Sequence, residues 1–244
     1  MKILSITSSS PICGVAILED EKIIKEINLN NGLTHSESLL PLISQILEET
    51  KLQLKDIDLL AIDIGPGSFT GIRIGIATVK AFVDSLNLKY VCVNSLEGLS
   101  LNVTNTGVIC SLIDAKRNNV FAEILENIDG NYIVKRQASF KNIADFLQEL
   151  KQLNPDYSIT FVGDGAIKNK ETILNYLPNS SFAYNNELCA KNIGISGYRN
   201  RSNPDYFQLE PLYLQKSEAE KKMEEKLNAG KWNWNLCYEY IWFE

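Results

Sequence analysis

Residues 63–86 read DIGPGSFTGIRIGIATVKAFVDSL, and the rest of the chain is arranged around them. An apolar run at residues 59–64 leads into Gly65-Pro66-Gly67, which cannot continue a strand ladder. Residues 71–86 then lack proline and repeat apolar side chains at helical spacing, with Ser68 or Thr70 available as the N-cap. The stretch therefore predicts a buried strand, a tight turn and a helix.

The predicted helix is apolar on nearly all sides. Its only charged residues are Arg73, Lys80 and Asp84. A helix of this kind is normally covered on two sides. Small residues at Gly71, Gly75 and Thr78 would let a second helix approach closely. We therefore expect one side to pack on the chain's own sheet and the other to contact another subunit.

The glycine-rich turn resembles phosphate-binding motifs but matches none of them. A P-loop needs a lysine and a hydroxyl residue after its last glycine, whereas Gly71 is followed by Ile72 and Arg73. The spacing of Gly65, Gly67 and Gly71 also departs from the dinucleotide-binding fingerprint. Two interpretations stay open: a tight turn without a ligand, and a helix N-terminus that contacts an anion or a partner's backbone.

Composition sets the outer limits on function. The 244 residues are 45% hydrophobic and 22% charged, which is ordinary for a globular protein. The net charge is −6 and the basic residues do not cluster in the sequence, so we expect no strong direct binding of nucleic acid. No run approaches the roughly 20 apolar residues of a membrane span, and no signal peptide is evident, which favours the cytoplasm. The five scattered cysteines are expected to be buried free thiols.

The order of predicted elements is repeated in two halves. Residues 1–102 read as three strands, a helix at 34–50 that begins with a Thr34–Glu37 capping box, a strand, a helix and a strand. Residues 103–215 repeat this order less clearly, with a last helix near 187–195. Each half matches a ribonuclease-H-like lobe. Residues 216–244 form a third part, read as a charged helix and an aromatic tail of unknown role.

A family resemblance rests on several motifs in the same order. The segment GPGSFTGIRIGIATVKAF follows THSESLLPLISQILEE and precedes VNSLEGLS, and EPLYL comes near residue 214. This set resembles the TsaB (YeaZ) family from Met1 to about Gln215. The resemblance implies an α/β, actin-like (ASKHA) fold with two ribonuclease-H-like halves, each a mixed sheet flanked by helices.

The resemblance also implies a function. Members of the family are non-catalytic paralogues and partners of TsaD in forming threonylcarbamoyladenosine (t6A) at the adenosine next to the anticodon of ANN-decoding tRNAs. TsaE would join the complex and TsaC would supply threonylcarbamoyl-adenylate. We expect a homodimer when TsaD is absent, and ATP, Mg²⁺ and a metal would belong to the partner proteins. The alternative is an autonomous ATPase or small-molecule kinase.

Three substitutions favour the non-catalytic interpretation. Thr7 stands where ATP-using relatives have an aspartate that orients Mg²⁺. Ser95 and Leu99 stand where TsaD-type enzymes carry paired metal-binding histidines, and His35 is the only histidine in the chain. We therefore expect no catalytic residue and no metal site. For Asp114 two interpretations stay open: the side chain caps a turn after a strand, or it helps to bind a metal ion in the cleft between the two halves.

Two sets of residues are candidates for binding. The partner interface is expected at His35, Leu39, Ile43, Ile46, Gly71, Ile72, Arg73, Gly75, Ile76 and Val79. A nucleotide or anion, if one binds, is expected at Gly65, Gly67, Ser68, Thr70, Asp114, Gly163 and Gly165.

Overall fold

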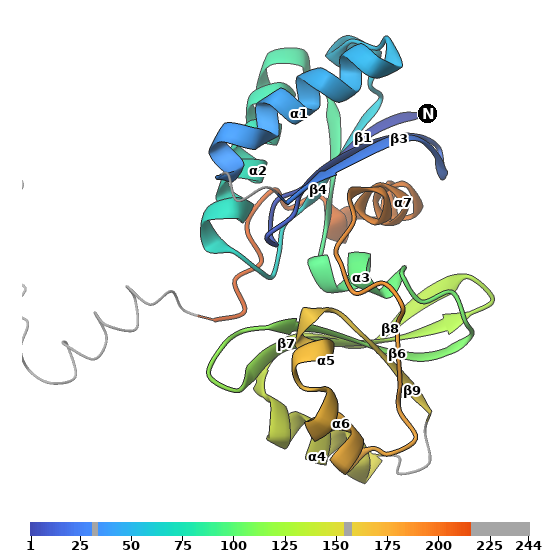
Figure 1. The fold of residues 1–244 in the computed structure, drawn as a ribbon. Helices are drawn as coiled ribbons and strands as arrows, with labels where there is room; N and C mark the ends of the chain where they lie inside the picture. The colour runs from blue at the N-terminus through green and yellow to red at the C-terminus, as the bar shows by residue number, and fades with distance from the viewer. Residues whose placement is uncertain (31–33, 154–157, 216–244) are drawn as a thin grey trace, which may run out of the picture. The chain divides into compact units, whose positions relative to one another are not determined.

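The first half of the chain forms a five-stranded mixed sheet with the order β3-β2-β1-β4-β5, and Figure 1 shows it with α1 and α2 beside it. The computed structural model describes residues 1–30, 34–153 and 158–215. β1 pairs antiparallel with β2 and parallel with β4. The strands are β1 Lys2–Thr7, β2 Cys13–Glu19, β3 Lys22–Leu29, β4 Leu59–Asp63 and β5 Lys89–Val93. Successive side chains of β1, β2 and β4 are buried, so both faces of the sheet are covered at these strands, whereas the edge strand β3 is largely exposed.

Helices from distant parts of the chain cover the two faces of this sheet. The first face is covered by α1 (His35–Thr50) and α2 (Phe69–Leu86). The opposite face is covered by α7 (Ala190–Asn200), whose Ala190 and Ile193 pack with Ile3, Ala16 and Val91. The sequence placed a helix near 187–195 in the second lobe. That placement is wrong, because α7 lies beside the first sheet (Figure 1) and its Gly194 and Gly197 pack closely against side chains of that sheet.

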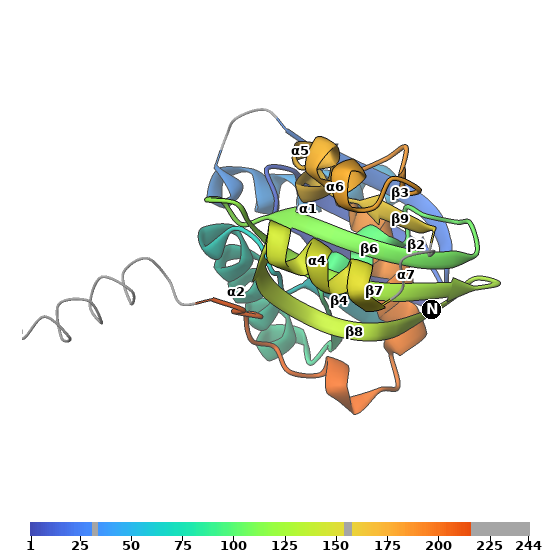
Figure 2. The same ribbon diagram turned by 90° about the horizontal axis from the view of Figure 1, so that it is seen from below.

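The second half forms another five-stranded sheet with the order β10-β9-β6-β7-β8. Its strands are β6 Gly107–Asp114, β7 Asn119–Ile128, β8 Asn131–Asn142, β9 Ile159–Val162 and β10 Ser181–Phe182. Figure 2 shows α4 lying across this sheet. The helices of the outer face are α4 Ile143–Leu153, α5 Asp164–Lys168 and α6 Lys170–Tyr176. The short α3 (Ser95–Ser100) packs between the two sheets.

Several element boundaries differ from the sequence expectation for local reasons. α2 begins at Phe69 because the Ser68 Oγ caps it by accepting from the Gly71 N–H at 3.2 Å. A 3-10 turn, η1 (Leu54–Asp56), precedes β4, which ends at Asp63. In the second half, the helical stretch from Asp164 to Tyr176 is divided at Asn169 into α5 and α6. A second 3-10 turn, η2 (Pro204–Tyr206), follows α7.

Residues 1–214 form one compact unit. The expected boundary between lobes at residue 102 falls in the connection between α3 and β6. The expected charged helix and aromatic tail of residues 216–244 lie outside the described residues. Within the described ranges, no helix is both long enough and apolar enough to cross a membrane.

The described cysteines are buried free thiols, as expected from their apolar neighbours. They are Cys13, Cys92, Cys110 and Cys189. Burial raises the pKa of the Cys13 thiol to about 11, so this thiol stays protonated at neutral pH. Cys237 lies outside the described residues.

Candidate functional site

The apolar side chains expected to face a partner lie in the core instead. None of them is more than 5% exposed, and they pack on the first sheet and on one another. They are Leu39, Ile43 and Ile46 of α1 and Ile72, Ile76 and Val79 of α2. The expectation that these side chains contact a partner is not met in the single chain, because the sheet and the neighbouring helix already bury them.

The glycines of α2 also face the chain itself. A Cβ added to Gly71 would lie 1.9 Å from the Ser8 carbonyl oxygen, and one added to Gly75 would lie 2.6 Å from the Ser8 Oγ. The Ser8 hydroxyl donates to the Gly71 carbonyl at 2.8 Å. His35 Nε2 donates to the Ser10 carbonyl at 2.8 Å and so fixes α1 to the same loop. The small residues therefore admit the β1–β2 loop, not a second helix.

The exposed side of α2 carries different residues. Ala77 and Ala81 are exposed there, and Ile74 is half-buried. Arg73, the one predicted interface residue whose side chain is exposed, donates from Nε to the Tyr213 hydroxyl at 2.6 Å. Tyr213 is 42% exposed and stacks on Phe69 with ring centroids 4.7 Å apart. This surface, which we call the outer face of α2, comprises Phe69, Arg73, Ile74, Ala77, Ala81 and Tyr213.

The glycine-rich turn packs against the backbone of the β1–β2 loop. A Cβ on Gly67 would lie 2.2 Å from the Ser9 carbonyl oxygen, which accepts a hydrogen bond from the Ser68 N–H at 2.7 Å. Gly65 has a φ of +97°, a conformation that favours glycine, and Thr70 is exposed. Of the two open interpretations, the contacts favour a strand-to-helix turn packed on its own chain.

A buried carboxylate that the sequence did not single out lies at the centre of these contacts. Asp63, at the end of β4, is fully buried. Its Oδ2 accepts from Thr7 Oγ1 at 2.7 Å and Ser9 Oγ at 2.5 Å, and its Oδ1 accepts from Ser95 Oγ at 2.5 Å and the Gly65 N–H at 2.9 Å. Burial raises the pKa of Asp63, and these hydrogen bonds oppose that shift. An acidic residue within the apolar run at residues 59–64 was the available signal.

The residues around Asp63 do not fit the Mg²⁺ or metal chemistry of enzymatic relatives. Thr7 stands at the position of the Mg²⁺-orienting aspartate, and Ser95 and Leu99 stand at the positions of the metal-binding histidines. The hydroxyls of Thr7 and Ser95 each donate a hydrogen bond to Asp63, and the Leu99 side chain is 2% exposed in the core. Hydroxyl donors pointed at one carboxylate cannot neutralise a hard cation. Across residues 1–30, 34–153 and 158–215, no three His, Cys, Asp or Glu side chains gather closely enough to hold a metal ion.

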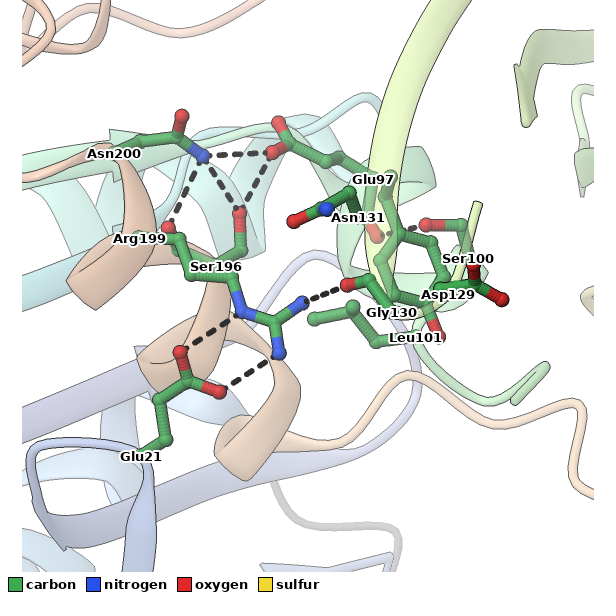
Figure 3. Close-up of a pocket in the computed structure, with 11 residues that line it drawn as sticks. Glu21, Glu97, Ser100, Leu101, Asp129, Gly130, Asn131, Ser196, Arg199 and Asn200 are labelled. Atoms are coloured by element: carbon green, nitrogen blue, oxygen red, sulfur yellow. Dashed lines mark hydrogen bonds and ion pairs between the residues drawn. The ribbon is translucent and has the colours of Figure 1, made fainter. Parts of the chain in front are cut away.

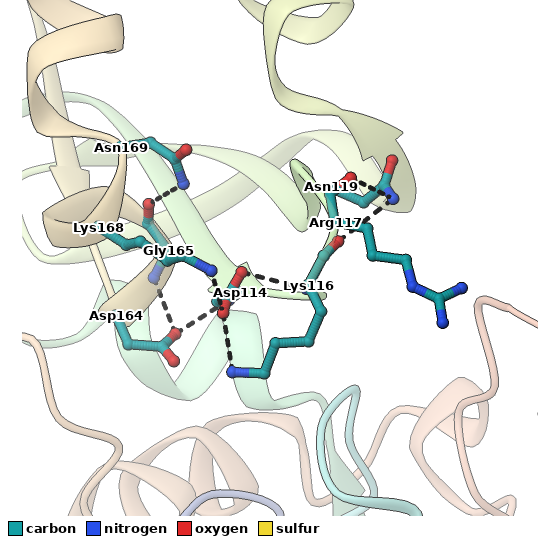
Figure 4. A network of polar contacts seen from close by, with 8 residues as sticks. All are labelled: Asp114, Lys116, Arg117, Asn119, Asp164, Gly165, Lys168 and Asn169. Atoms are coloured by element: carbon teal, nitrogen blue, oxygen red, sulfur yellow. Dashed lines mark hydrogen bonds and ion pairs between the residues drawn. The ribbon is translucent and has the colours of Figure 1, made fainter. Parts of the chain in front are cut away.

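Asp114 is held by two lysines at the end of β6 (Figure 4). Its Oδ2 pairs with Lys116 Nζ at 2.9 Å and Lys168 Nζ at 2.8 Å, and its Oδ1 accepts from the Lys116 N–H at 3.1 Å. Burial acts to raise the pKa of Asp114, but the hydrogen bonds from Lys168 and Lys116 outweigh it, so the pKa is lowered. These contacts support the turn-capping alternative.

The two glycines predicted beside Asp114 serve chain packing. A Cβ on Gly163 would lie 2.1 Å from the Leu112 carbonyl oxygen, and one on Gly165 would lie 2.9 Å from the Ile113 carbonyl carbon. Gly163 also has a φ of +108°. The close approach of α5 to β6 explains both glycines without a ligand.

Replacing Asp63 should destabilise the chain strongly. In Asp63→Ala the hydroxyls of Thr7, Ser9 and Ser95 lose their shared acceptor inside the core, so we expect a loss of about 3 kcal/mol in the free energy of unfolding. Urea denaturation measures this loss. Asp84→Ala, on the exposed side of α2, is the control and should change stability by less than about 0.5 kcal/mol. Equal stability of the two variants would contradict a structural role for Asp63.

A pocket of about 460 Å³ that the sequence did not predict lies where the two sheets meet (Figure 3). Arg199 of α7 pairs with Glu21 at 2.7 Å and donates to the Gly130 carbonyl at 3.1 Å, which joins turns of both sheets. Glu97 of α3 accepts from Ser196 Oγ at 2.7 Å and Asn200 Nδ2 at 3.0 Å. The pocket is lined by Glu21, Glu97, Ser100, Leu101, Asp129, Gly130, Asn131, Tyr132, Ser196, Arg199 and Asn200.

Comparison with known families identifies relatives along most of the chain. The family model described as TsaD, tRNA N6-adenosine threonylcarbamoyltransferase, matches residues 31–222. The tRNA threonylcarbamoyladenosine biosynthesis protein TsaB of Bacillus subtilis is 28% identical over 228 residues, which cover 91% of this chain and 97% of that protein. The TsaB protein of Haemophilus influenzae is 26% identical, with the same coverage of 91% and 97%.

Solved structures share the fold. YeaZ from Pseudomonas aeruginosa superposes with a TM-score of 0.68 at 19% identity, covering 87% of this chain and 99% of that chain. A ROK family protein from Streptococcus pneumoniae, solved with sucrose, gives a TM-score of 0.52 at 11% identity, covering 82% of this chain and 99% of that chain. These likenesses and the two mixed sheets flanked by helices confirm the expected actin-like fold.

Proposed function

Because the chain belongs to the TsaB (YeaZ) family, within the wider family that the TsaD model describes, we propose that it takes part in t6A formation on tRNA as a non-catalytic subunit. The single observation that carries the non-catalytic role is the engagement of Thr7 and Ser95 by Asp63. The same engagement argues against the alternative of an autonomous ATPase or kinase. The Thr7 hydroxyl donates to Asp63 and supplies no carboxylate to orient Mg²⁺.

The proposed partner is TsaD, with TsaE joining the complex and TsaC supplying threonylcarbamoyl-adenylate. ATP, Mg²⁺ and any metal belong to those proteins in this proposal. We place the complex in the cytoplasm, without a membrane contact and without strong direct binding of tRNA by this chain. The net charge of −6 supports the last point, because phosphate contacts supply most of the affinity of proteins for nucleic acid.

The proposed contact surface is the outer face of α2. Ala77 and Ala81 are small and exposed, so a partner helix can approach the α2 backbone there, while the core side chains hold α2 in place. Arg73 and the stacked Phe69–Tyr213 pair lie on the same face and offer a cation and aromatic area, which are enriched at protein interfaces. We propose that a homodimer uses this face when TsaD is absent.

Reconstitution tests the proposed function. The purified chain alone should show negligible ATP hydrolysis and no transfer of the threonylcarbamoyl group, whereas TsaD with TsaE, TsaC and tRNA should form t6A only when this chain is added. Mass spectrometry of digested tRNA measures the product. Mg²⁺-dependent turnover by the chain alone, abolished in Asp114→Ala, would contradict the proposal, as would full activity of the mixture that lacks this chain.

A further inference from the structure

A buried glutamate and a half-buried one lie where the sheets contact one another. Glu123 lies on β7 of the second sheet and is 1% exposed, and Asn94, the N-cap of α3, donates to its Oε1 at 2.9 Å. Glu97 of α3 accepts from Ser196, Asn200 and the Tyr206 hydroxyl, the last at 3.1 and 3.2 Å. The contact between the sheets therefore contains two carboxyl groups and an amide.

The strand geometry leaves two neighbouring oxygens without partners. The register of β7 and β8 shifts between Ala122 and Ile124, so Glu123 lies at a bulge, and on β6 its register partner is Ser111. Side chains at paired positions of antiparallel strands share one face of the sheet. The Oε2 of Glu123 and the Oγ of Ser111 are both buried, and neither has a hydrogen-bond partner among the described residues.

No basic side chain compensates the two carboxyl groups within the described part of the chain. The titratable groups that face Glu123 are Glu97 of α3 and Tyr206 of η2, both able to carry negative charge and neither a cation. Arg136 of β8 is paired opposite Ile124, on the other face of the sheet, and forms an ion pair with Glu149. On α7, Arg199 is engaged by Glu21.

A proton is the simplest ligand that satisfies these groups. A protonated Glu123 carries no charge into the core, and its Oε2–H becomes a donor on the same face of the sheet as the unpartnered oxygen of Ser111, to which a bridging water would connect it. We propose that Glu123 is a proton-binding site at the contact between the two sheets, and that this contact weakens when the proton is released to water.

The pKa shifts agree in direction. Burial, followed by the charge of Glu97, raises the pKa of Glu123 from its ordinary 4.5 to about 8, and burial also raises the pKa of Glu97. Below about pH 4.5 the folded and unfolded chains are both protonated at Glu123. Between about pH 4.5 and 8 only the folded chain keeps the proton, so stability falls as the pH rises through this window and levels off above it.

Glu123→Gln tests the proposal in the full chain. Glutamine keeps the acceptor for Asn94 but cannot ionise, so the folding equilibrium constant of the wild type should fall relative to the variant, by up to about tenfold per pH unit between pH 5 and 8. Urea denaturation at several pH values measures this. The control, Glu126→Gln on the same strand, removes a carboxylate that is paired with Lys135 and should keep the wild-type pH dependence.

The outcomes distinguish a bound proton from a purely structural role and from a bound metal cation. A loss of stability in Glu123→Gln that is equal at every pH would overturn the proposal, since a merely structural role has that signature. Wild-type stability that depends on Na⁺ compared with choline at equal ionic strength would also overturn it, because a metal cation would then be the ligand. If the variant does not fold, carbon-13 NMR of labelled glutamate in the wild type decides: a titration midpoint near 8 supports the site, and one below about 5 excludes it.

Discussion

Ala77→Glu should lower the affinity of the chain for TsaD by about 100-fold or more while leaving the fold intact. Ala77 is exposed on the outer face of α2, so the single chain tolerates a carboxylate there. In a complex that covers this face, the added charge would be buried without a partner, which costs several kcal/mol, and each ~1.4 kcal/mol is a tenfold loss of affinity. Titration calorimetry with TsaD measures the binding, and t6A formation should fall with it.

The control for Ala77→Glu adds the same charge elsewhere. Gln148 is exposed on α4, beside the second sheet, and Gln148→Glu should bind TsaD like the wild type. Circular dichroism should show native helix content for both variants. Unchanged binding by Ala77→Glu would exclude the outer face of α2 as the docking surface, although another surface of the chain would remain open to TsaD.

Ile76→Glu, one residue away, should instead unfold the chain. Ile76 is 5% exposed and packs in the core with residues of α1 and the first sheet. The substitution both removes an apolar contact and places an unpaired carboxylate in the core, so we expect a loss of about 4 kcal/mol or more in the free energy of unfolding. Urea denaturation and the yield of soluble protein measure this loss.

A conservative variant tests whether burial accounts for the effect at Ile76. Ile76→Leu keeps the apolar volume and should cost less than about 1.5 kcal/mol. A stable Ile76→Glu protein that only fails to bind TsaD would contradict this prediction and would place Ile76 at the partner contact. The neighbouring pair Ala77 and Ile76 thus separates loss of binding from loss of folding on one helix.

Local patterns in the sequence predicted most elements of both sheets. The Gly65-Pro66-Gly67 turn and the contact between Thr34 and Glu37 follow from residues close together in the chain, and both are present in the structure. Periodicity also identified the apolar side of α2 correctly. It could not show what covers that side, because the answer depends on α1 and on strands from distant segments. For that reason the apolar pattern alone predicted a partner interface at side chains of α1 and α2 that lie in the core.

The Asp63 network shows the same limit at the level of single groups. Its hydroxyl donors come from the end of β1, the loop after it and the start of α3, more than 30 residues from Asp63 along the chain. No spacing rule connects such positions in one sequence. The substitutions at Thr7 and Ser95 were visible, but the carboxylate that engages both of them was not.

The position of α7 has a consequence for biosynthesis. The first sheet is made from residues 2–93, yet its second face is closed by residues 190–200. While the ribosome makes the intervening segment, the apolar side chains of that face, among them Ile3, Leu18 and Val91, have no cover from α7. The N-terminal lobe therefore cannot reach its final packing until almost the whole described chain has left the exit tunnel, and a nascent chain that stalls before residue 190 presents this face to chaperones.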